Sequence, residues 1–299
     1  MANSIVAMKR GEDGRTLAYE ALGEIEADKT LSQSKKILIK PNITADMPAS
    51  TGVTTHPSMV EGTLQFMKDI GVVSDVIVGE GGSCDITKVS DKFGFFDIAK
   101  RYKARLVDFN RDEEIFLPVP NPLAIERFGI AKTVTECDCI INLPCLKVHT
   151  SEISVTMAMK NMMGCIVQNR HMMHRDFDNK IIDLLKVVRP TLNIIDGIVG
   201  REGGEIEGDP VGTKVIIASK DFVAADAVGA AVMGFKQDEV EYIRLARTYG
   251  FGNAELENIE IKGASIESVR RPFKRAPRNM PAHWYGSLNE ESPSLDTSK

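Results

Sequence analysis

The sequence contains no apolar run near the roughly 18 residues that a membrane-spanning helix needs. Its N-terminus, MANSIVAMKRGEDGR, has no apolar core of signal-peptide length and becomes charged almost at once. Basic residues are not in excess either, because the net charge of the 299 residues is -5. These absences predict a cytoplasmic protein, and they give no reason to expect nucleic acid or a membrane as a partner.

Cysteine is scarce, and its spacing does not match the common metal-binding patterns. The 5 cysteines make an odd count, and the chain has no C-x2-C pair. We therefore expect free thiols in a reducing compartment. The stretch CDCIINLP reads as a strand in which Cys137 and Cys139 point to one face. We expect these side chains to be small buried hydrophobes. The alternative is an iron–sulfur cluster, which takes four thiolates, on Cys137, Cys139, Cys145 and Cys165.

Nucleotide-binding motifs are absent as well. The chain has no G-x4-G-K-[ST] loop, and its glycine-rich stretch GEGGS does not complete G-x-G-x-x-G. No motif therefore indicates a cofactor.

What the sequence does contain is an alternation of short apolar strands with helical segments. With 43% hydrophobic and 26% charged residues, the composition is that of an ordinary globular protein. Strands are expected at 35–43, 74–79, 104–110, 137–144, 191–200, 213–221 and 258–263, and helices at 56–71, 95–103, 221–234, 238–250 and from Ser154. This order predicts one α/β domain over residues 1–269, with a mostly parallel sheet and helices on both faces.

The last part of the chain, residues 270–299, differs from the rest. It contains four prolines after Val269 and little periodicity. We expect a C-terminal arm or a partly disordered tail. An arm of this kind could also strap a neighbouring subunit, which would make the protein a homo-oligomer.

Polar residues follow several of the expected strands. Lys40 and Asn42 end the first, and a long loop then leads to His56 at the start of a helix. Lys147 and His149 follow the strand ending at Leu143, and Asp196 follows another. Because ligands of parallel sheets bind beyond the carboxyl ends of the strands, these side chains are predicted to line one pocket.

The segment LPCLKVHTSEISVTMAMKNMMGC, residues 143–165, carries the strongest local signal. On a helix, its methionines gather on one side, as expected for a core-facing surface. Thr156, Lys160 and Gly164 are spaced by four and form a line on the other side. No acidic residue occurs between Glu152 and Asp176, so this line lacks the mixed charges of an ordinary exposed helix face.

The wider region from Leu143 to Arg175 is basic within an acidic chain. The region contains four cations, Lys147, Lys160, Arg170 and Arg175, but one carboxylate, that of Glu152. His149, His171 and His174 lie in the same region. Such a cluster suits a carboxylate or phosphate ligand. His171 and His174 would share a face of a helix, so a divalent metal held by these two and His149 is the alternative.

Six motifs in a fixed order carry a family resemblance. They are IKPN, THP at the start of a helix, INLPCLKVH, TMAMKNMMG, IIDGIVG and DFVAADAVGAAVMG. Over residues 35–235 the chain resembles the uncharacterised domain-of-unknown-function 362 family. The resemblance places the K-x-H and K-N-x-x-G positions on Lys147, His149, Lys160, Asn161 and Gly164, and the K-P-N and H-P positions on Lys40, Asn42 and His56.

Many proteins of that family add a ferredoxin-like segment with C-x2-C spacing. This chain has no such segment. The resemblance therefore carries no iron–sulfur role to this protein.

Together these features predict an enzyme that acts on a small anionic organic molecule by general acid–base chemistry, such as an isomerase, a racemase or a lyase. Lys147 and Lys160 would hold the anionic group or a developing oxyanion, and His149 would move the proton. The other binding residues would be Lys40, Asn42, His56, Thr156, Asn161, Gly164, His171, His174 and Asp196. The alternatives are an iron–sulfur or metal-dependent redox protein and a non-catalytic protein that binds an anionic metabolite.

Overall fold

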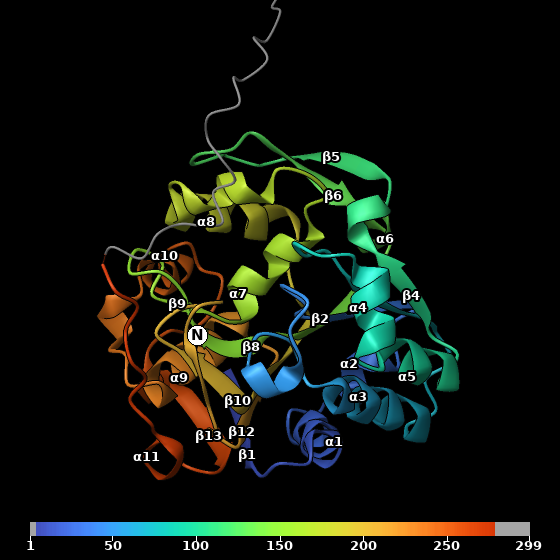
Figure 1. The fold of residues 1–299 in the computed structure, drawn as a ribbon, viewed down its shortest axis with the longest axis horizontal. Coiled ribbons are helices and arrows are strands. Elements are labelled where there is room, and N and C mark those ends of the chain that lie inside the picture. Colours follow the sequence, from blue (N-terminus) through green and yellow to red (C-terminus); the bar gives the residue numbers. More distant parts are fainter. Residues whose placement is uncertain (1–3, 279–299) are drawn as a thin grey trace, which may run out of the picture.

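A long mixed sheet forms the centre of the molecule (Figure 1). The structure is a computed structural model that describes residues 4–278. Eight strands lie side by side in the order β13-β1-β12-β10-β7-β2-β3-β4. They are β1 (Ser4–Arg10), β2 (Lys36–Pro41), β3 (Asp75–Glu80), β4 (Arg105–Asp108), β7 (Cys139–Leu143), β10 (Leu192–Glu202), β12 (Val215–Ser219) and β13 (Ile259–Gly263). Within this row β12 is antiparallel to both its neighbours, and the other adjacent pairs are parallel, which confirms the predicted sheet.

Three shorter strands continue this sheet next to β7 and β10. Strand β8 (Cys145–Val148) continues the path of β7 and pairs with β10 and with β9 (Val155–Thr156). Strand β11 (Asp209–Val211) pairs with the far end of β10. A separate hairpin consists of β5 (Glu114–Pro118) and β6 (Arg127–Ala131).

Alternate residues of each strand point to opposite faces of the sheet, so both faces carry apolar side chains. Helices cover each of these faces. In β2, Ile37 and Ile39 pack into one core and Leu38 into the other. The first core is covered by α1 (Gly14–Glu24), α2 (Asp28–Leu31), α3 (Pro57–Asp69), α4 (Ile86–Lys92) and α5 (Phe95–Arg101). The second is covered by α6 (Lys132–Thr135), α7 (Ala158–Asn161), α8 (Phe177–Val187), α9 (Phe222–Val232), α10 (Glu241–Thr248) and α11 (Ile266–Val269). In Figure 1, α1, α3 and α5 lie at the lower right and α8 to α10 at the left.

The strand order reverses direction between β2 and β7. From β2 the chain moves outward through β3 to β4, whereas from β7 it moves the other way through β10 and β12. The loops that leave the carboxyl ends of β2 and β7 therefore separate and leave a crevice between them. This is the place where a parallel sheet can bind a ligand.

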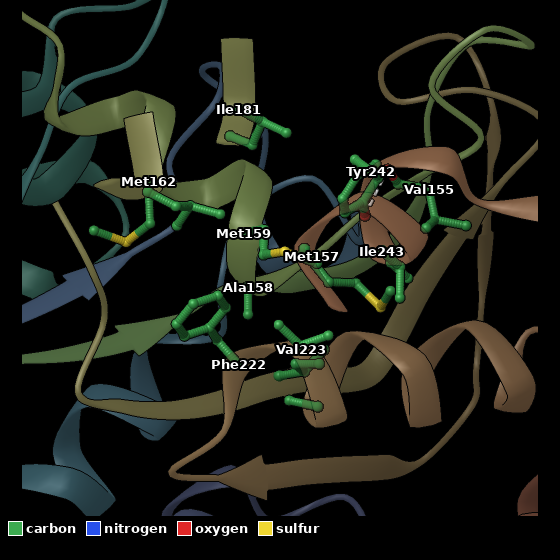
Figure 2. Close-up of a cluster of buried hydrophobic side chains, with 14 of the residues drawn as sticks. Val155, Met157, Ala158, Met159, Met162, Ile181, Phe222, Val223, Tyr242 and Ile243 are labelled. Atoms are coloured by element: carbon green, nitrogen blue, oxygen red, sulfur yellow. Dashed lines mark hydrogen bonds between the residues drawn. The ribbon is translucent and has the colours of Figure 1, made fainter. Parts of the chain in front are cut away.

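The segment from Val155 to Cys165 does not form the predicted amphipathic helix. Residues 155–156 are strand β9, the helix α7 is a single turn, and Met162–Cys165 is a 3-10 helix, η3. All of these residues are buried. Figure 2 shows Met157, Met159 and Met162 packed among side chains of α8, α9 and α10. The methionine spacing predicted a one-sided helix, but the segment is enclosed by neighbours on all sides, so periodicity could not define its exposed face.

The cysteines are free and are distributed between the two cores. Strand β7 begins at Cys139, which packs in the core under α1 to α5, whereas Cys137 packs against the core under α6 to α11. The prediction that they share a face is therefore wrong, since Cys137 lies before the strand begins. Within residues 4–278, no three His, Cys, Asp or Glu side chains are arranged to hold a metal ion.

Residues 270–278 lie against the second core. The backbone N–H groups of Arg271 and Phe273 donate to the carbonyls of Val232 and Met233 at 2.8 and 2.9 Å, and the Phe273 ring is buried. The rest of the predicted arm, 279–299, lies outside the described residues. In the part that the structure describes, every helix is too short or too polar to cross a bilayer.

Candidate functional site

A cavity of ≈ 160 Å³ lies at the crevice between β2 and β7. The loops after β2 and β3 form one wall, and the segment from His149 to Gly164 forms another. The remaining walls are the 3-10 helix η4 (Arg170–His174) and the loop between β10 and β11. The cavity therefore lies beyond the carboxyl ends of parallel strands, at the topological position where ligands bind in this class of fold.

The structure brings most of the predicted site residues to this cavity. Its walls include Asn42, His149, Thr156, Lys160, Asn161, Gly164, His171 and His174. Four others, Lys40, Lys147, His56 and Asp196, do not reach its surface. Lys40 and Lys147 lie directly behind the wall, and His56 and Asp196 lie away from the cavity.

Lys147 lies behind the wall and supports it. Its ammonium donates to Asn42 Oδ1 at 2.7 Å, to Thr44 Oγ1 at 3.2 Å and to the carbonyl of Val53 at 3.3 Å. A fourth contact, at 3.1 Å, goes to the carboxylate of Glu205. The lysine is 1% exposed, and its strand position opposite Thr156 fixes its direction. Lys147 thus ties the loop after β2 to an acid that lines the cavity.

Glu205 is the acid that the local sequence did not reveal. It lies in the loop between β10 and β11, and one carboxylate contacts three cationic or ionisable side chains: Lys147, His149 at 2.8 Å and Lys160 at 3.7 Å. Burial alone would raise the pKa of Glu205, but the nearby lysines and histidine outweigh it and hold this pKa well below the usual value. Glu205 is therefore ionised at neutral pH.

His149 is buried beside this carboxylate and is 4% exposed. Its Nε2 is 2.8 Å from a carboxylate oxygen of Glu205, and its Nδ1 has no hydrogen-bond partner among the described residues. Burial, followed by the charge of Lys160, lowers the pKa of His149. The ring is therefore neutral near pH 7 and retains an unoccupied nitrogen that can accept a proton.

Lys160 presents its ammonium to the cavity. It makes no hydrogen bond to the described residues, and the carboxylate within ion-pair range is that of Glu205, 3.7 Å away. Burial is the main cause that lowers the pKa of Lys160, and Glu205 opposes it. A buried ammonium without a close acceptor is a costly arrangement, so this group is suited to bind an anion.

The two histidines of η4 complete this end of the cavity. His174 stacks on His149 with ring centroids 5.3 Å apart and an angle of 23° between the planes. Burial, together with the charge of Lys160, lowers the pKa of His174 to about 3. His171 is exposed at the rim. The i,i+3 spacing therefore placed both residues at the cavity, although on a 3-10 turn and not on a long helix.

Lys40 forms a buried ion pair with Glu80, a residue that lines the cavity. Its ammonium contacts both carboxylate oxygens of Glu80, at 2.7 and 2.8 Å. Burial raises the pKa of Glu80, whereas Lys40 lowers it. Gly164 lies directly above, and a Cβ at this position would be 1.9 Å from the Glu80 carboxylate. The space beside Gly164 is thus occupied by an internal ion pair and not by a ligand.

A row of amide side chains fixes the residue next to Lys160. Asn161 Nδ2 donates to Asn142 Oδ1 at 2.7 Å and faces the carbonyls of Lys40 and Pro41. Asn142 in turn contacts Asn193 of β10 at 3.1 Å. Three acceptors around Nδ2 settle the orientation of the Asn161 amide. This row links α7 to strands β2, β7 and β10.

His56 and Asp196 do not belong to the cavity, contrary to the prediction. His56 is exposed at the N-cap of α3, where its ring accepts a hydrogen bond from the N–H of Ser58 at 3.2 Å. Its backbone N–H donates to Asp196 at 2.7 Å. Asp196 is buried and also accepts from the N–H of Ile198. The H-P motif is therefore a helix start, and Asp196 holds that start against β10.

Asp226 positions α7 from a neighbouring helix. Its carboxylate accepts from the N–H groups of Ala158 and Met159, at 2.7 and 3.1 Å. These are unpaired donors of the first turn of α7, so Asp226 fixes the turn that carries Lys160. Burial raises the pKa of Asp226 to about 7. No local pattern predicts this contact, because Asp226 looks like an ordinary residue of an apolar helix.

Three comparisons relate this chain to known proteins. Residues 37–231 match the model of a family described as domain of unknown function (DUF362). The thylakoid-associated protein sll1697 of Synechocystis sp. is 25% identical over an alignment of 235 residues. The match covers 72% of this chain and 71% of that protein. The lactate racemase apoprotein from Thermoanaerobacterium thermosaccharolyticum matches with 12% identity and a TM-score of 0.45. That match covers 76% of this chain but 57% of the racemase, less than two thirds of its length.

The first prediction concerns Asp226 and pH. The carboxyl of Asp226, with its pKa raised from 3.8 to about 7, holds a proton in the folded protein over a pH range in which the unfolded chain has released it. Its contribution to stability is therefore present at pH 4 and is lost as the pH rises through 7. Relative to Asp226→Asn, the wild type should lose free energy of unfolding over this range, by at most about 1.4 kcal/mol per pH unit.

Urea denaturation at pH 4, 5, 6 and 7 measures this difference. Asp91→Asn, at an exposed position on α4, is the control and should show a constant offset from the wild type. A constant offset for Asp226→Asn as well would contradict the pKa assigned to Asp226.

Proposed function

The chain belongs to the DUF362 family, and from this premise we propose that it is an enzyme that acts on a small anionic organic molecule by general acid–base chemistry. The proposal rests on one arrangement. A buried, neutral histidine, His149, with an unpartnered ring nitrogen lies in a small cavity beside a lysine that lacks a close acceptor. The first group can accept a proton and the second can hold negative charge.

His149 is the proposed base. A neutral imidazole can remove a proton near pH 7, and its lowered pKa keeps it neutral. The ring of His174 stacks against it and limits its rotation. Burial of His149 also keeps bulk water away from the transferred proton.

Lys160 and Lys147 are the proposed binding groups. A carboxylate in the cavity would meet the Lys160 ammonium directly, and the Lys147 ammonium lies behind the wall, where it contacts Glu205. In a reaction that removes a proton next to a carbonyl, negative charge develops on the carbonyl oxygen, and a fixed ammonium stabilises it. Isomerisation, racemisation and lyase-type elimination all share this step.

Size and position fit a small substrate. The cavity of ≈ 160 Å³ is too small for a nucleotide and suits a short organic acid. A purely binding protein would need the lysines but not an unpartnered histidine. The role of His149 therefore separates the enzyme from a non-catalytic carrier or sensor.

The second prediction concerns Lys160. Lys160→Met should weaken the binding of small carboxylates by roughly ten- to a hundredfold, because a charge-assisted contact of about 1.5–3 kcal/mol is lost. Calorimetric titration with a panel of small carboxylates measures this change. Lys88→Met, at a position 85% exposed, removes the same charge away from the cavity and should leave affinity unchanged. Equal affinities in the wild type and Lys160→Met would return Lys160 to a structural role.

The third prediction concerns His149. His149→Asn should abolish proton abstraction but leave carboxylate affinity within about threefold, because asparagine can form hydrogen bonds and cannot exchange a proton near pH 7. Exchange of substrate C–H for deuterium in D2O, followed by NMR over the same panel, reports this step without a known product. His56→Asn alters an exposed histidine outside the cavity and is the control. Exchange that continues in His149→Asn would refute the role of His149 as the base.

A further inference from the structure

One carboxylate from a distant loop occupies the centre of the basic cluster, and its contacts to the two lysines are long. Glu205 meets Lys147 at 3.1 Å in a hydrogen bond. It lies 2.8 Å from Nε2 of His149 and 3.7 Å from the Lys160 ammonium. Strong bonds between ammonium and carboxylate are about 2.7–2.9 Å long. The cluster therefore has more donor capacity than Glu205 uses.

The loop that carries Glu205 has fixed ends and a glycine-rich tip. Strands β10 and β11 pair as far as Glu202 and Asp209. Arg201 donates to the carbonyl of Thr51, at 2.7 Å, and to the carbonyl of Ile206 within the loop. Gly203 and Gly204 adopt φ values of +78° and +151°, which other residues rarely adopt. The two glycines give the backbone before Glu205 a conformational freedom that the paired strands lack.

Charge makes Glu205 and a bound carboxylate alternatives. Without any acid, two buried ammonium groups would lie together uncompensated, which is strongly unfavourable. With Glu205 and a ligand carboxylate both present, the two carboxylates would compete for the same three side chains, so a contact that the ligand gains there is one that Glu205 loses.

We infer that Glu205 is a built-in substitute for the carboxylate of the ligand, and that the ligand's carboxylate binds to Lys147, His149 and Lys160 after Glu205 has moved out. This inference rests on the proposed function and adds the position and class of the anionic group. The group is a carboxylate and not a phosphate dianion, because it replaces a carboxylate of one negative charge. The loop 203–208 then has to open before the ligand binds.

The test compares acetate binding in four proteins, by thermal unfolding at constant ionic strength with sodium chloride as the balancing salt. They are the wild type, Glu205→Ala, Glu205→Gln and Glu207→Gln. Glu207 also lines the cavity but forms no ion pair with the described residues, so its variant removes a nearby charge without removing a competitor. Glu205→Gln keeps the shape of the side chain in case Glu205→Ala does not fold.

A tethered carboxylate competes at an effective concentration of about millimolar or more. Acetate should therefore bind the Glu205 variants at least about tenfold more tightly than the wild type, and Glu207→Gln within about threefold of the wild type. Equal tightening in the Glu205 and Glu207 variants would show a general charge effect and overturn the inference. Unchanged affinity in the Glu205 variants would also overturn it, while acetate binding to the wild type would leave the proposed function intact. Absence of acetate binding in all four proteins would contradict both.

Discussion

The arrangement of this site depends on two buried ammonium groups, those of Lys147 and Lys160, and on the carboxylate of Glu205 that compensates them. Each buried ion costs several kcal/mol unless another charge or hydrogen bond offsets it. Lys40 is offset completely, by Glu80, which lines the cavity. Lys147 is offset by neutral acceptors and one oxygen of Glu205, whereas Lys160 has a single long contact to the same acid. Lys160, which faces the cavity, is therefore the less compensated of the two. An anion that binds there gains the most favourable electrostatic interaction.

The fold places this imbalance at the reversal point of the sheet. Strands β2 and β7 are neighbours, but their chains continue in opposite directions, so the crevice above them is walled by loops and not by a crossover helix. Strand β8 carries Lys147, His149 follows directly after its end, and α7 brings Lys160 to the crevice. Asp226 and the amides of Asn142 and Asn161 hold α7 in that position. The basic cluster is thus built on strands and capped turns, whereas its acid is on a loop.

The sequence was sufficient for the fold class and for the family, both of which are confirmed. Runs of apolar residues followed by polar ones are local signals, and they correctly brought His149, Lys160 and Asn42 to one cavity. Contacts between distant segments have no such signal. Glu205 and Asp226 reach α7 from other elements, so the line through Thr156 and Lys160 seemed free of acids when it was not. Burial on all sides also removed the exposed face on which the predicted helix of residues 155–165 depended.

A crystal structure of the protein soaked in a small carboxylate such as acetate tests whether Lys147, His149 and Lys160 form a carboxylate site. We expect a bound carboxylate within hydrogen-bonding distance of the Lys160 ammonium and near the His149 ring, with Glu205 displaced from the cluster. A carboxylate found only on exposed lysines, with Glu205 unmoved between the three side chains, would show that these side chains do not form such a site.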